Sequence, residues 1–177
     1  TDFPNSPHLN LRIVKEDEVI KLGVFRVSFF HVNHNIPDDF GIKIDLPIGT
    51  IINTSDFKFD PYPINDKPVN IEKLRSFGDK GILLLLSDST GAEEEGHSIS
   101  EKTIKENLEI IFKQANGRIV TATFASLINR IQQLITLSEA CGRKVVIQGF
   151  TMKSNVEISK ELGYIKASKH TFIDAKD

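Results

Sequence analysis

The spacing of hydrophobic residues changes near residues 60–68, and this change constrains the fold more than any other feature of the sequence. Before it, Phe25, Val27 and Phe29 alternate with polar residues, and a similar alternation recurs at 42–46. A period of two is typical of antiparallel strands with one buried face. Residues 46–50 then predict a turn into a further strand at 51–53. We expect the first part of the chain to form consecutive hairpin strands of a larger sheet.

After the segment rich in Pro, Asp and Asn at 60–68, strands and helices are expected to alternate. The continuous apolar run at 82–86 predicts a strand buried on both faces of a parallel sheet. Two more strands are expected to begin at 119–120 and 145–147. Apolar residues at helical spacing, 104–115 and 127–135, lie between these strands, and a third helix is expected at about 153–162.

Residues with known preferences mark the ends of these helices. Ser98 with Glu101 predicts a capping box, Gly117 and Gly142 occupy expected C-cap positions, and Gly163 stops the third helix. Alternating strands and helices imply right-handed crossovers and a Rossmann-like α/β unit. We therefore expect an α/β protein with two parts, residues 1–70 and 71–177.

Composition limits the classes of protein to which the chain can belong. Its 177 residues suffice for one ordinary domain or two small ones. A net charge of −2 lacks the basic surplus of many nucleic-acid-binding proteins, so any RNA binding must be local. Cys141 is the single cysteine, which excludes an intramolecular disulfide framework and a cysteine-based zinc cluster. No apolar run approaches the ~20 residues of a membrane span, and the start lacks a signal-peptide pattern. We expect a cytoplasmic protein with no membrane partner.

Polar segments follow all three strands expected in the second part, at 87–91, 121–126 and 149–151. Ligands of open α/β sheets bind beyond the carboxyl ends of the strands, and hydroxyl groups suit phosphate oxygens. Serine and threonine are also ordinary helix caps, so both interpretations stay open. The glycine-rich dinucleotide motif and the P-loop motif do not occur in the sequence.

His34, Asp56 and Asp88 each follow an apolar run and are candidates for a metal site. Zinc accepts imidazole and carboxylate ligands, but it requires three or four of them, and no further cluster supplies the rest. Each residue also has a structural interpretation: a histidine at a sheet edge, an aspartate in a turn and a helix N-cap. These alternatives are open on the residues alone.

The motifs around these residues resemble those of ribonuclease J, in the β-CASP branch of the metallo-β-lactamase superfamily. Residues 34–38, His-Asn-Ile-Pro-Asp, are similar to the family's His-Ser-Ile-Pro-Asp, and residues 55–60, Ser-Asp-Phe-Lys-Phe-Asp, to Gly-Asp-Phe-Lys-Phe-Asp. Residues 85–90 resemble the acidic motif that opens the β-CASP domain, and 122–126, 130–133 and 142–145 resemble its next strand and helix. The resemblance covers nearly the whole chain.

The resemblance implies both a fold and a set of site residues. The fold is part of an αββα metallo-β-lactamase sandwich with antiparallel strands, followed by a Rossmann-like β-CASP domain. His34 is implied to bind one zinc and Asp56 to bridge two. Asp88 is implied to have a catalytic role, orienting a ligand or relaying a proton. We assign phosphate or sugar contacts with RNA to Ser89, Thr90 and Ser126.

The implied activity is zinc-dependent cleavage of RNA, 5′–3′ exonucleolytic, endonucleolytic or both, in RNA maturation and decay. The family's His-x-His-x-Asp-His segment would lie before Thr1, and its later histidine motifs would lie beyond Asp177. We therefore expect this fragment to be inactive and to lack the zinc pair of its parent. We also expect a homo-oligomeric parent, and self-association of the fragment through exposed apolar sheet surface.

The chain departs from the family pattern at positions expected to face RNA. Gly91 replaces a usual Asn, Leu127 and Asn129 replace a common Asn and His, and Phe150 and Thr151 replace Arg and Ser. The loss of that arginine weakens an expected phosphate contact.

Two alternatives remain at this level. One is a β-CASP nuclease that acts on DNA or on RNA 3′ ends. The other is a stand-alone Rossmann-like module that binds a phosphorylated small molecule at the three polar strand ends.

Overall fold

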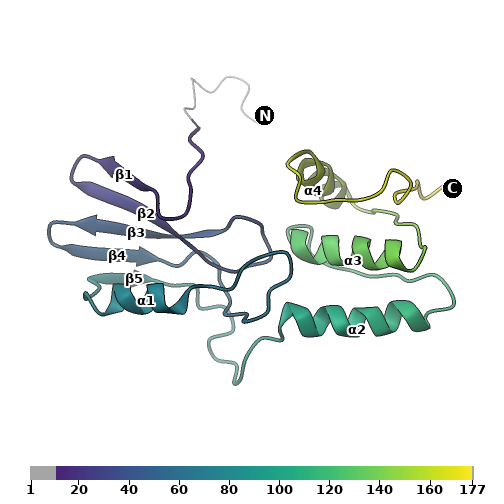
Figure 1. Ribbon diagram of the computed structural model, residues 1–177, viewed down its shortest axis with the longest axis horizontal. Coiled ribbons are helices and arrows are strands. Elements are labelled where there is room, and N and C mark those ends of the chain that lie inside the picture. Colours follow the sequence, from purple (N-terminus) through teal and green to yellow (C-terminus); the bar gives the residue numbers. More distant parts are fainter. Residues whose placement is uncertain (1–10, 177) are drawn as a thin grey trace.

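The computed structural model describes residues 11–176 and has a sheet at one end and helices at the other (Figure 1). The elements in chain order are β1 (Val19–Leu22), β2 (Phe25–His31), β3 (Phe40–Leu46), β4 (Gly49–Asn53), α1 (Ile71–Gly78), β5 (Leu84–Leu86), α2 (Glu101–Gln114), α3 (Ile128–Ala140) and α4 (Phe150–Glu161). The expected α/β class is confirmed.

The sheet has five strands in the order β1-β2-β3-β4-β5. The first four strands are antiparallel, and the β2–β3 register places Val27 opposite Ile44 and Phe29 opposite Ile42. The alternating apolar residues are therefore correctly assigned to hairpin strands. Leu46 pairs with Gly49, so Pro47 and Ile48 form the expected turn. Strand β5 pairs parallel to β4, which makes the sheet mixed.

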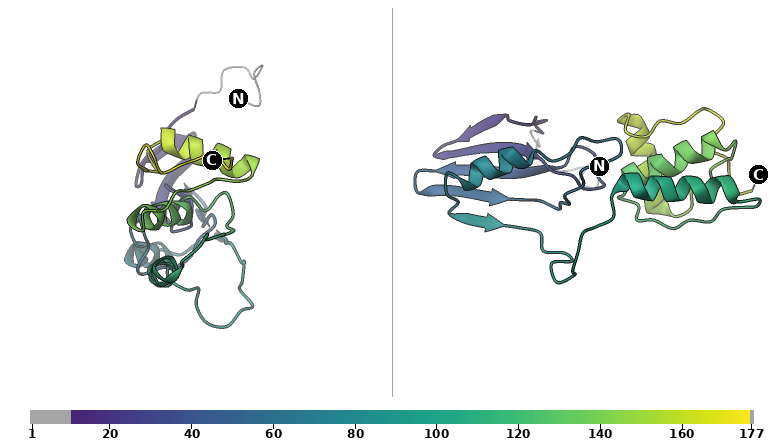
Figure 2. Two further views of the ribbon diagram at one scale, coloured as in Figure 1. Left: turned by 90° about the vertical axis from the view of Figure 1, so that its right-hand side faces the viewer. Right: turned by 60° about the horizontal axis from the view of Figure 1, so that its bottom comes forward.

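Helix α1 covers one face of this sheet, as the right-hand view of Figure 2 shows. The buried residues Phe30, Val32 and Ile52 form a cluster against which Leu74 and Phe77 of α1 pack. The rings of Phe30 and Phe77 meet edge to face, 5.6 Å between centroids. This packing places the ends of β2 and β4 firmly in the sheet core.

The helical part has its own hydrophobic core between α3, α4 and the segment that follows α4. Its buried members are Ile128, Ile131, Ile135, Val156 and Ile165. The three helices that the apolar spacing predicted are confirmed as α2, α3 and α4. Helix α4 begins at Phe150, three residues before the expected start.

The helix caps differ in part from the sequence interpretation. Ser100, not Ser98, is the N-cap of α2, and its hydroxyl accepts a hydrogen bond from the amide of Lys102. Helix α2 ends at Gln114 with Ala115 as C-cap, so Gly117 lies outside the helix. Gly142 and Gly163 have positive φ values of 63° and 83° directly after the C-caps of α3 and α4, as expected.

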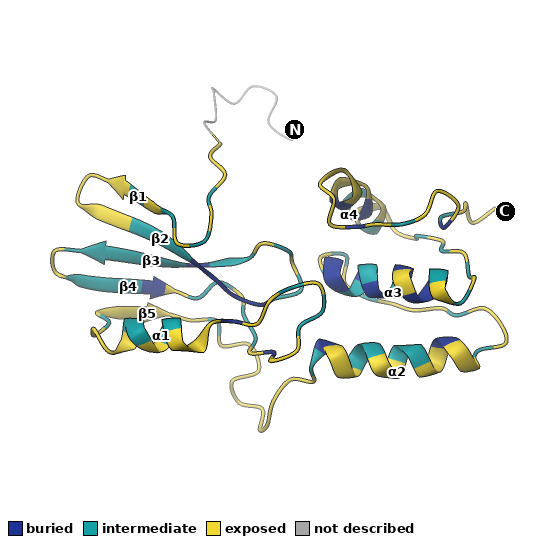
Figure 3. Cartoon of the chain, viewed as in Figure 1, coloured by how far each residue is buried: buried dark blue, intermediate teal, exposed yellow. Residues whose placement is uncertain are grey.

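The expected strands at 119–120 and 145–147 do not form. Val145 makes only an isolated parallel bridge with Phe172, and residues 118–124 have no strand pairing. The expected strand at 82–86 does form as β5, but it lies at an edge of the first sheet. Its three leucines are 46–59% exposed, so the expectation of burial on both faces is wrong (Figure 3). An apolar run becomes a buried strand only where a neighbour supplies backbone partners.

The arrangement of the sheet and helices bears on the expected division near residue 70. Helix α1 and β5 lie beyond that point but pack on or extend the first sheet, whereas the helical part begins at Glu101. Residues 11–176 contain one sheet and no second sheet facing it. The sandwich and the 1–70/71–177 division stay predictions. No helix within residues 11–176 has the length and apolar character to cross a membrane.

Gly41 offers a direct test of the sheet core. A Cβ atom at this position would lie 2.1 Å from Cζ of Phe30, because the Phe30 ring lies across the Gly41 backbone. We expect Gly41→Ala to lower the free energy of unfolding by about 1–3 kcal/mol, measured by urea denaturation. Gly117→Ala is the control, since nothing lies within 4 Å of its Cβ position and its φ is not positive. Equal stability of the two variants would contradict this packing.

Candidate functional site

Sheet topology brings the ends of β2, β4 and β5 to one edge. Strands β2 and β4 both run antiparallel to β3, so they are parallel to each other, and β5 is parallel to β4. Their carboxyl ends therefore lie on the same side, where His34, Asp56 and Asp88 follow in the chain. This edge is the candidate site.

His34 and Asp56 face each other across this edge. Nε2 of His34 lies 3.9 Å from Oδ2 of Asp56, and their side chains are 30% and 70% exposed. Their segments are also joined by backbone, because the amide of Lys58 donates to the carbonyl of Asn33 at 2.7 Å. The structure thus brings together the two residues that we identified as metal ligands.

The separation of these two atoms suits a shared metal ion. Two ligand atoms bound at about 2.1 Å to a tetrahedral zinc lie roughly 3.4 Å apart, so a small shift from 3.9 Å suffices. Within residues 11–176, however, no group of three or more His, Cys, Asp or Glu side chains has metal-binding geometry. His34 and Asp56 fit part of a zinc site, which needs further ligands.

Asp88 lies beside this pair without joining it in a ligand group. Its carboxylate accepts the amide of Thr90 at 2.9 Å, and its own amide donates to Oγ1 of Thr54 at 3.1 Å. The hydrogen bond from the Thr90 amide lowers the pKa of Asp88 the most, and the amide of Phe57 contributes further. Thr54 lies two residues before Asp56, so the backbone of Asp88 contacts the segment that carries the candidate ligand.

The three predicted RNA contacts lie in two places. Ser89 and Thr90 are exposed in the turn after β5, whereas Ser126 is exposed just before α3. No hydrogen bond among residues 11–176 joins Ser126 to the other two. The beginning of α3 nevertheless approaches the site, because the amide of Asn129 donates to the carbonyl of Asn35, the residue after His34.

Asn33 was not predicted, yet it organises the turn that holds His34. It is 3% exposed. Its side-chain amide donates to Oδ2 of Asp66 at 2.6 Å and to the carbonyl of Lys67 at 2.7 Å. Its Oδ1 accepts the amide of Val69 at 3.1 Å. Only its place beside His34 in the motif could have indicated this role.

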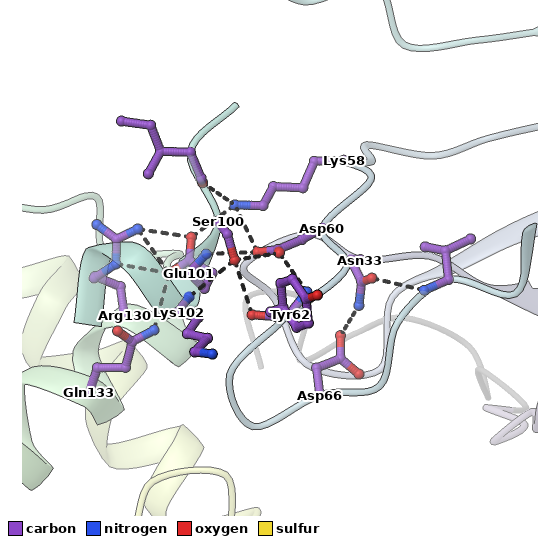
Figure 4. A network of polar contacts seen from close by, with 12 residues as sticks. Asn33, Lys58, Asp60, Tyr62, Asp66, Ser100, Glu101, Lys102, Arg130 and Gln133 are labelled. Atoms are coloured by element: carbon purple, nitrogen blue, oxygen red, sulfur yellow. Dashed lines mark hydrogen bonds and ion pairs between the residues drawn. The ribbon is translucent and has the colours of Figure 1, made fainter. Parts of the chain in front are cut away.

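A buried network of charged residues was also missed (Figure 4). Asp60 is 4% exposed and accepts the hydroxyl of Ser100 and the amide of Glu101, both at 2.7 Å. Burial alone would raise the pKa of Asp60, but the hydrogen bonds from Glu101, Ser100 and the amide of Tyr62 outweigh it and lower the pKa. Asp60 therefore stabilises the positive N-terminus of α2 as an anion.

Glu101 continues this network into α3. It is 5% exposed, and its carboxylate accepts Nζ of Lys58 at 3.0 Å and Nη2 of Arg130 at 2.9 Å. Nε2 of Gln133 donates to it at 3.1 Å, whereas Oε1 of Gln133 is buried without a partner. Sequence reasoning assigned Glu101 to a capping box, but the structure places it in an ion cluster.

A polar cleft of about 490 Å³ lies between the sheet loops and the helices. Its carboxylates already have donors: Tyr164 donates to Asp38, Asn33 to Asp66 and Thr171 to Glu139. Lys166 is the one lysine among its lining residues, and these include no arginine. The cleft therefore disfavours a phosphate group by charge.

The comparisons with known proteins agree with the sequence motifs. Residues 116–177 match the family described as Ribonuclease J, beta-CASP domain. The chain is 41% identical to "Ribonuclease J" of Thermus thermophilus, 38% to "Ribonuclease J" of Helicobacter pylori J99 and 36% to "Ribonuclease J2" of Bacillus subtilis. These matches cover 94–95% of this chain but only 24–30% of the relatives.

The fold also resembles a solved structure. It matches a crystal structure of a protein of unknown function from Enterococcus faecalis V583 with a TM-score of 0.62 and 16% sequence identity. The match covers 98% of this chain and 44% of the other. At this identity the likeness shows the fold alone.

Ser55 provides a test of the loop that carries Asp56. Its φ of 57° lies in the left-handed region, which costs a non-glycine residue about 1 kcal/mol. Ser55→Ala and Ser55→Gly both remove the hydrogen bond from its hydroxyl to Asp39. We therefore expect the glycine variant to have the larger free energy of unfolding, by about 1 kcal/mol, in urea denaturation.

The matched control for this comparison is Ser76 in α1. In a helix, alanine stabilises relative to glycine by about 1 kcal/mol, so the order of the two substitutions is expected to reverse. The same order at both positions would contradict a left-handed Ser55.

The low pKa of Asp60 predicts a pH-dependent contribution to stability. A carboxyl group with a folded pKa below its unfolded value, about 3.9, stabilises the fold above that value and loses the effect as pH falls through the folded pKa. We expect Asp60→Asn to lower the free energy of unfolding by about 2 kcal/mol at pH 7. The difference from the unsubstituted protein should shrink below about pH 4, measured by urea denaturation. The exposed Asp79→Asn is the control, and a constant difference down to pH 3 would contradict the assignment.

Proposed function

We propose, on the premise that this chain belongs to the ribonuclease J family, that it forms part of a metal-dependent ribonuclease. The observation that carries the proposal is the approach of His34 to Asp56, 3.9 Å between Nε2 and Oδ2. These two residues lie in the two segments that resemble the family's ligand motifs. Their loops meet although they are separated by two strands in the sequence.

His34 and Asp56 would both be ligands that hold zinc. Bound zinc supplies an activated water and stabilises negative charge at the phosphate. Because the described residues offer only part of a ligand set, the remaining ligands would come from other parts of the protein. We therefore propose that the 177-residue chain alone does not bind the zinc pair and does not cleave RNA.

Asp88 would keep the Asp56 loop in place rather than donate a proton. Its lowered pKa keeps it ionised at neutral pH, and its backbone amide donates to Oγ1 of Thr54, two residues before Asp56. A contact with the loop of this kind orients the neighbouring ligand, as partners of metal ligands commonly do. Ser89, Thr90 and Ser126 are exposed hydroxyls and would donate to RNA phosphates or sugars.

Several further properties belong to the same proposal. The intact protein would act as a 5′–3′ exoribonuclease, an endoribonuclease or both, in the maturation and decay of RNA in the cytoplasm. It would form homo-oligomers, and the isolated chain would self-associate through the exposed leucines of β5. Residues 1–70 and 71–177 would belong to the metallo-β-lactamase and β-CASP domains.

The alternative of a stand-alone phosphate-binding module loses its geometric support. It required polar segments at the ends of three parallel strands, and residues 119–120 and 145–147 are not strands. The second alternative is a β-CASP nuclease that prefers DNA or RNA 3′ ends. The choice of substrates in the experiment below distinguishes it from the proposed ribonuclease.

The test uses the full-length natural protein that contains this sequence. It measures the zinc content of that protein and its cleavage of 5′-monophosphorylated RNA. We expect His34→Ala and Asp56→Ala to lose zinc and to reduce cleavage at least about 100-fold. The exposed residues His170 and Asp79 provide matched controls, and His170→Ala and Asp79→Ala should retain both properties.

Substrate arms complete the design. Matched DNA and RNA with labels at either end distinguish the alternative specificities. Unchanged zinc content and cleavage in His34→Ala and Asp56→Ala would overturn the ligand assignment. Zinc-dependent cleavage by the 177-residue chain alone would overturn its proposed inactivity.

A further inference from the structure

The backbone of Lys58 joins the loops that carry the two candidate ligands. Asn33 and Lys58 form an isolated antiparallel bridge outside the named strands. Asn33 directly precedes His34, and Lys58 follows Asp56 by two residues. The backbone of Lys58 therefore ties the His34 loop to the Asp56 loop, and it does so where their side chains come within 3.9 Å.

The side chain of Lys58 points away from this bridge and toward the helical part (Figure 4). Nζ lies 3.0 Å from Oε1 of Glu101, the first residue of α2, and 3.6 Å from Oδ2 of Asp60. Both carboxylates are buried, with side chains 6% and 1% exposed, whereas the Lys58 side chain is 20% exposed. The ammonium group thus compensates two carboxylates in a poorly hydrated place.

Glu101 passes the connection on to α3. Arg130 donates to both carboxylate oxygens of Glu101, at 2.9 Å from Nη2 in each case. A guanidinium that contacts both oxygens fixes the orientation of the carboxylate. The Lys58 side chain therefore links the loops of the candidate site to the start of α2 and, through Glu101, to α3. It acts beside the hydrogen bonds that Asp60 accepts from Ser100 and Glu101.

We propose that Lys58 is a positioning residue that fixes the helical part of the molecule in register with the loops that carry His34 and Asp56. This inference rests on the proposed ribonuclease function, because the register matters for RNA held by the helical part and cleaved at the sheet edge. Ser126 lies two residues before the first residue of α3, on the part to which Lys58 is linked. A misplacement of about 1 Å between a bound substrate and the reacting groups costs roughly 100-fold in rate.

The kinetic test uses Lys58→Met in the longest natural chain that contains this sequence. Methionine keeps the apolar stem and removes the charge. We expect kcat for RNA cleavage to fall about 10- to 100-fold, with KM changed less than about threefold and zinc content retained. The loss should appear in kcat and not in KM. The contacts with RNA within the sheet part and within the helical part remain, and only the alignment of the two parts changes.

Lys43→Met is the matched control. Lys43 pairs with Asp45 in the sheet, and its side chain is 17% exposed, close to the 20% of Lys58. The control should keep kcat within about twofold even if it lowers stability. Lys58→Arg should recover most of the lost kcat, because the guanidinium retains the positive charge between the two carboxylates. An unchanged kcat in Lys58→Met, or equal losses in Lys58→Met and Lys43→Met, would overturn the proposal.

A second measurement reports the placement of the helical part relative to the sheet and does not depend on activity. Spin labels on Lys21→Cys in β1 and Glu106→Cys in α2, with Cys141→Ser, report the distance between the two parts. Lys58→Met should broaden the distance distribution, and Lys43→Met should not. If the unsubstituted protein does not cleave RNA, the proposed function is refuted. The comparison of spin-label distances between Lys58→Met and Lys43→Met then tests whether Lys58 positions the two parts, without reference to activity. A distribution unchanged by Lys58→Met would overturn that role.

Discussion

An ammonium group between two buried carboxylates joins the sheet part of the molecule to the helical part. Lys58 comes from the loop after β4, and Asp60 and Glu101 would be costly to bury without a cation and hydrogen-bond donors. Asp60 also accepts the first amide of α2, so the same group that requires the lysine fixes where the helix begins. The sheet and the helices are thus joined by electrostatics and hydrogen bonds, while each part has its own apolar core.

The candidate site depends on this joint and on the direction of the strands. Strands β2, β4 and β5 end on one side of the sheet, so residues separated widely in the sequence meet there. Asn33 holds the turn before His34 through three hydrogen bonds, and the amide of Asp88 donates to Oγ1 of Thr54 in the loop that carries Asp56. The partly exposed His34 is therefore supported by the buried Asn33 beside it.

Sequence patterns predicted a good part of this arrangement. The period-two alternation found β2 and β3, and the helical spacing found α2, α3 and α4, because both signals reflect local burial on one face. His34 and Asp56, which the motifs select as candidate ligands, lie 3.9 Å apart, and their role as ligands stays a prediction. The predicted strands at 119–120 and 145–147 were wrong, since an apolar run does not specify whether a partner strand is present. The role of Lys58 had no signal in periodicity, because its contact with Glu101 spans 43 positions of the chain.

The parallel pairing of β5 affects the order in which the sheet assembles. Strands β1 to β4 are neighbours in the sequence, and β3 and β4 are joined by a two-residue turn. Strand β5 reaches β4 only after residues 54–83, a connection that includes α1. Closing a long connection costs more chain entropy than closing a short one, so local pairings form earlier in folding. The loops that carry His34 and Asp56 are consequently in place before Asp88, and the candidate site assembles from the N-terminal side of the chain onward.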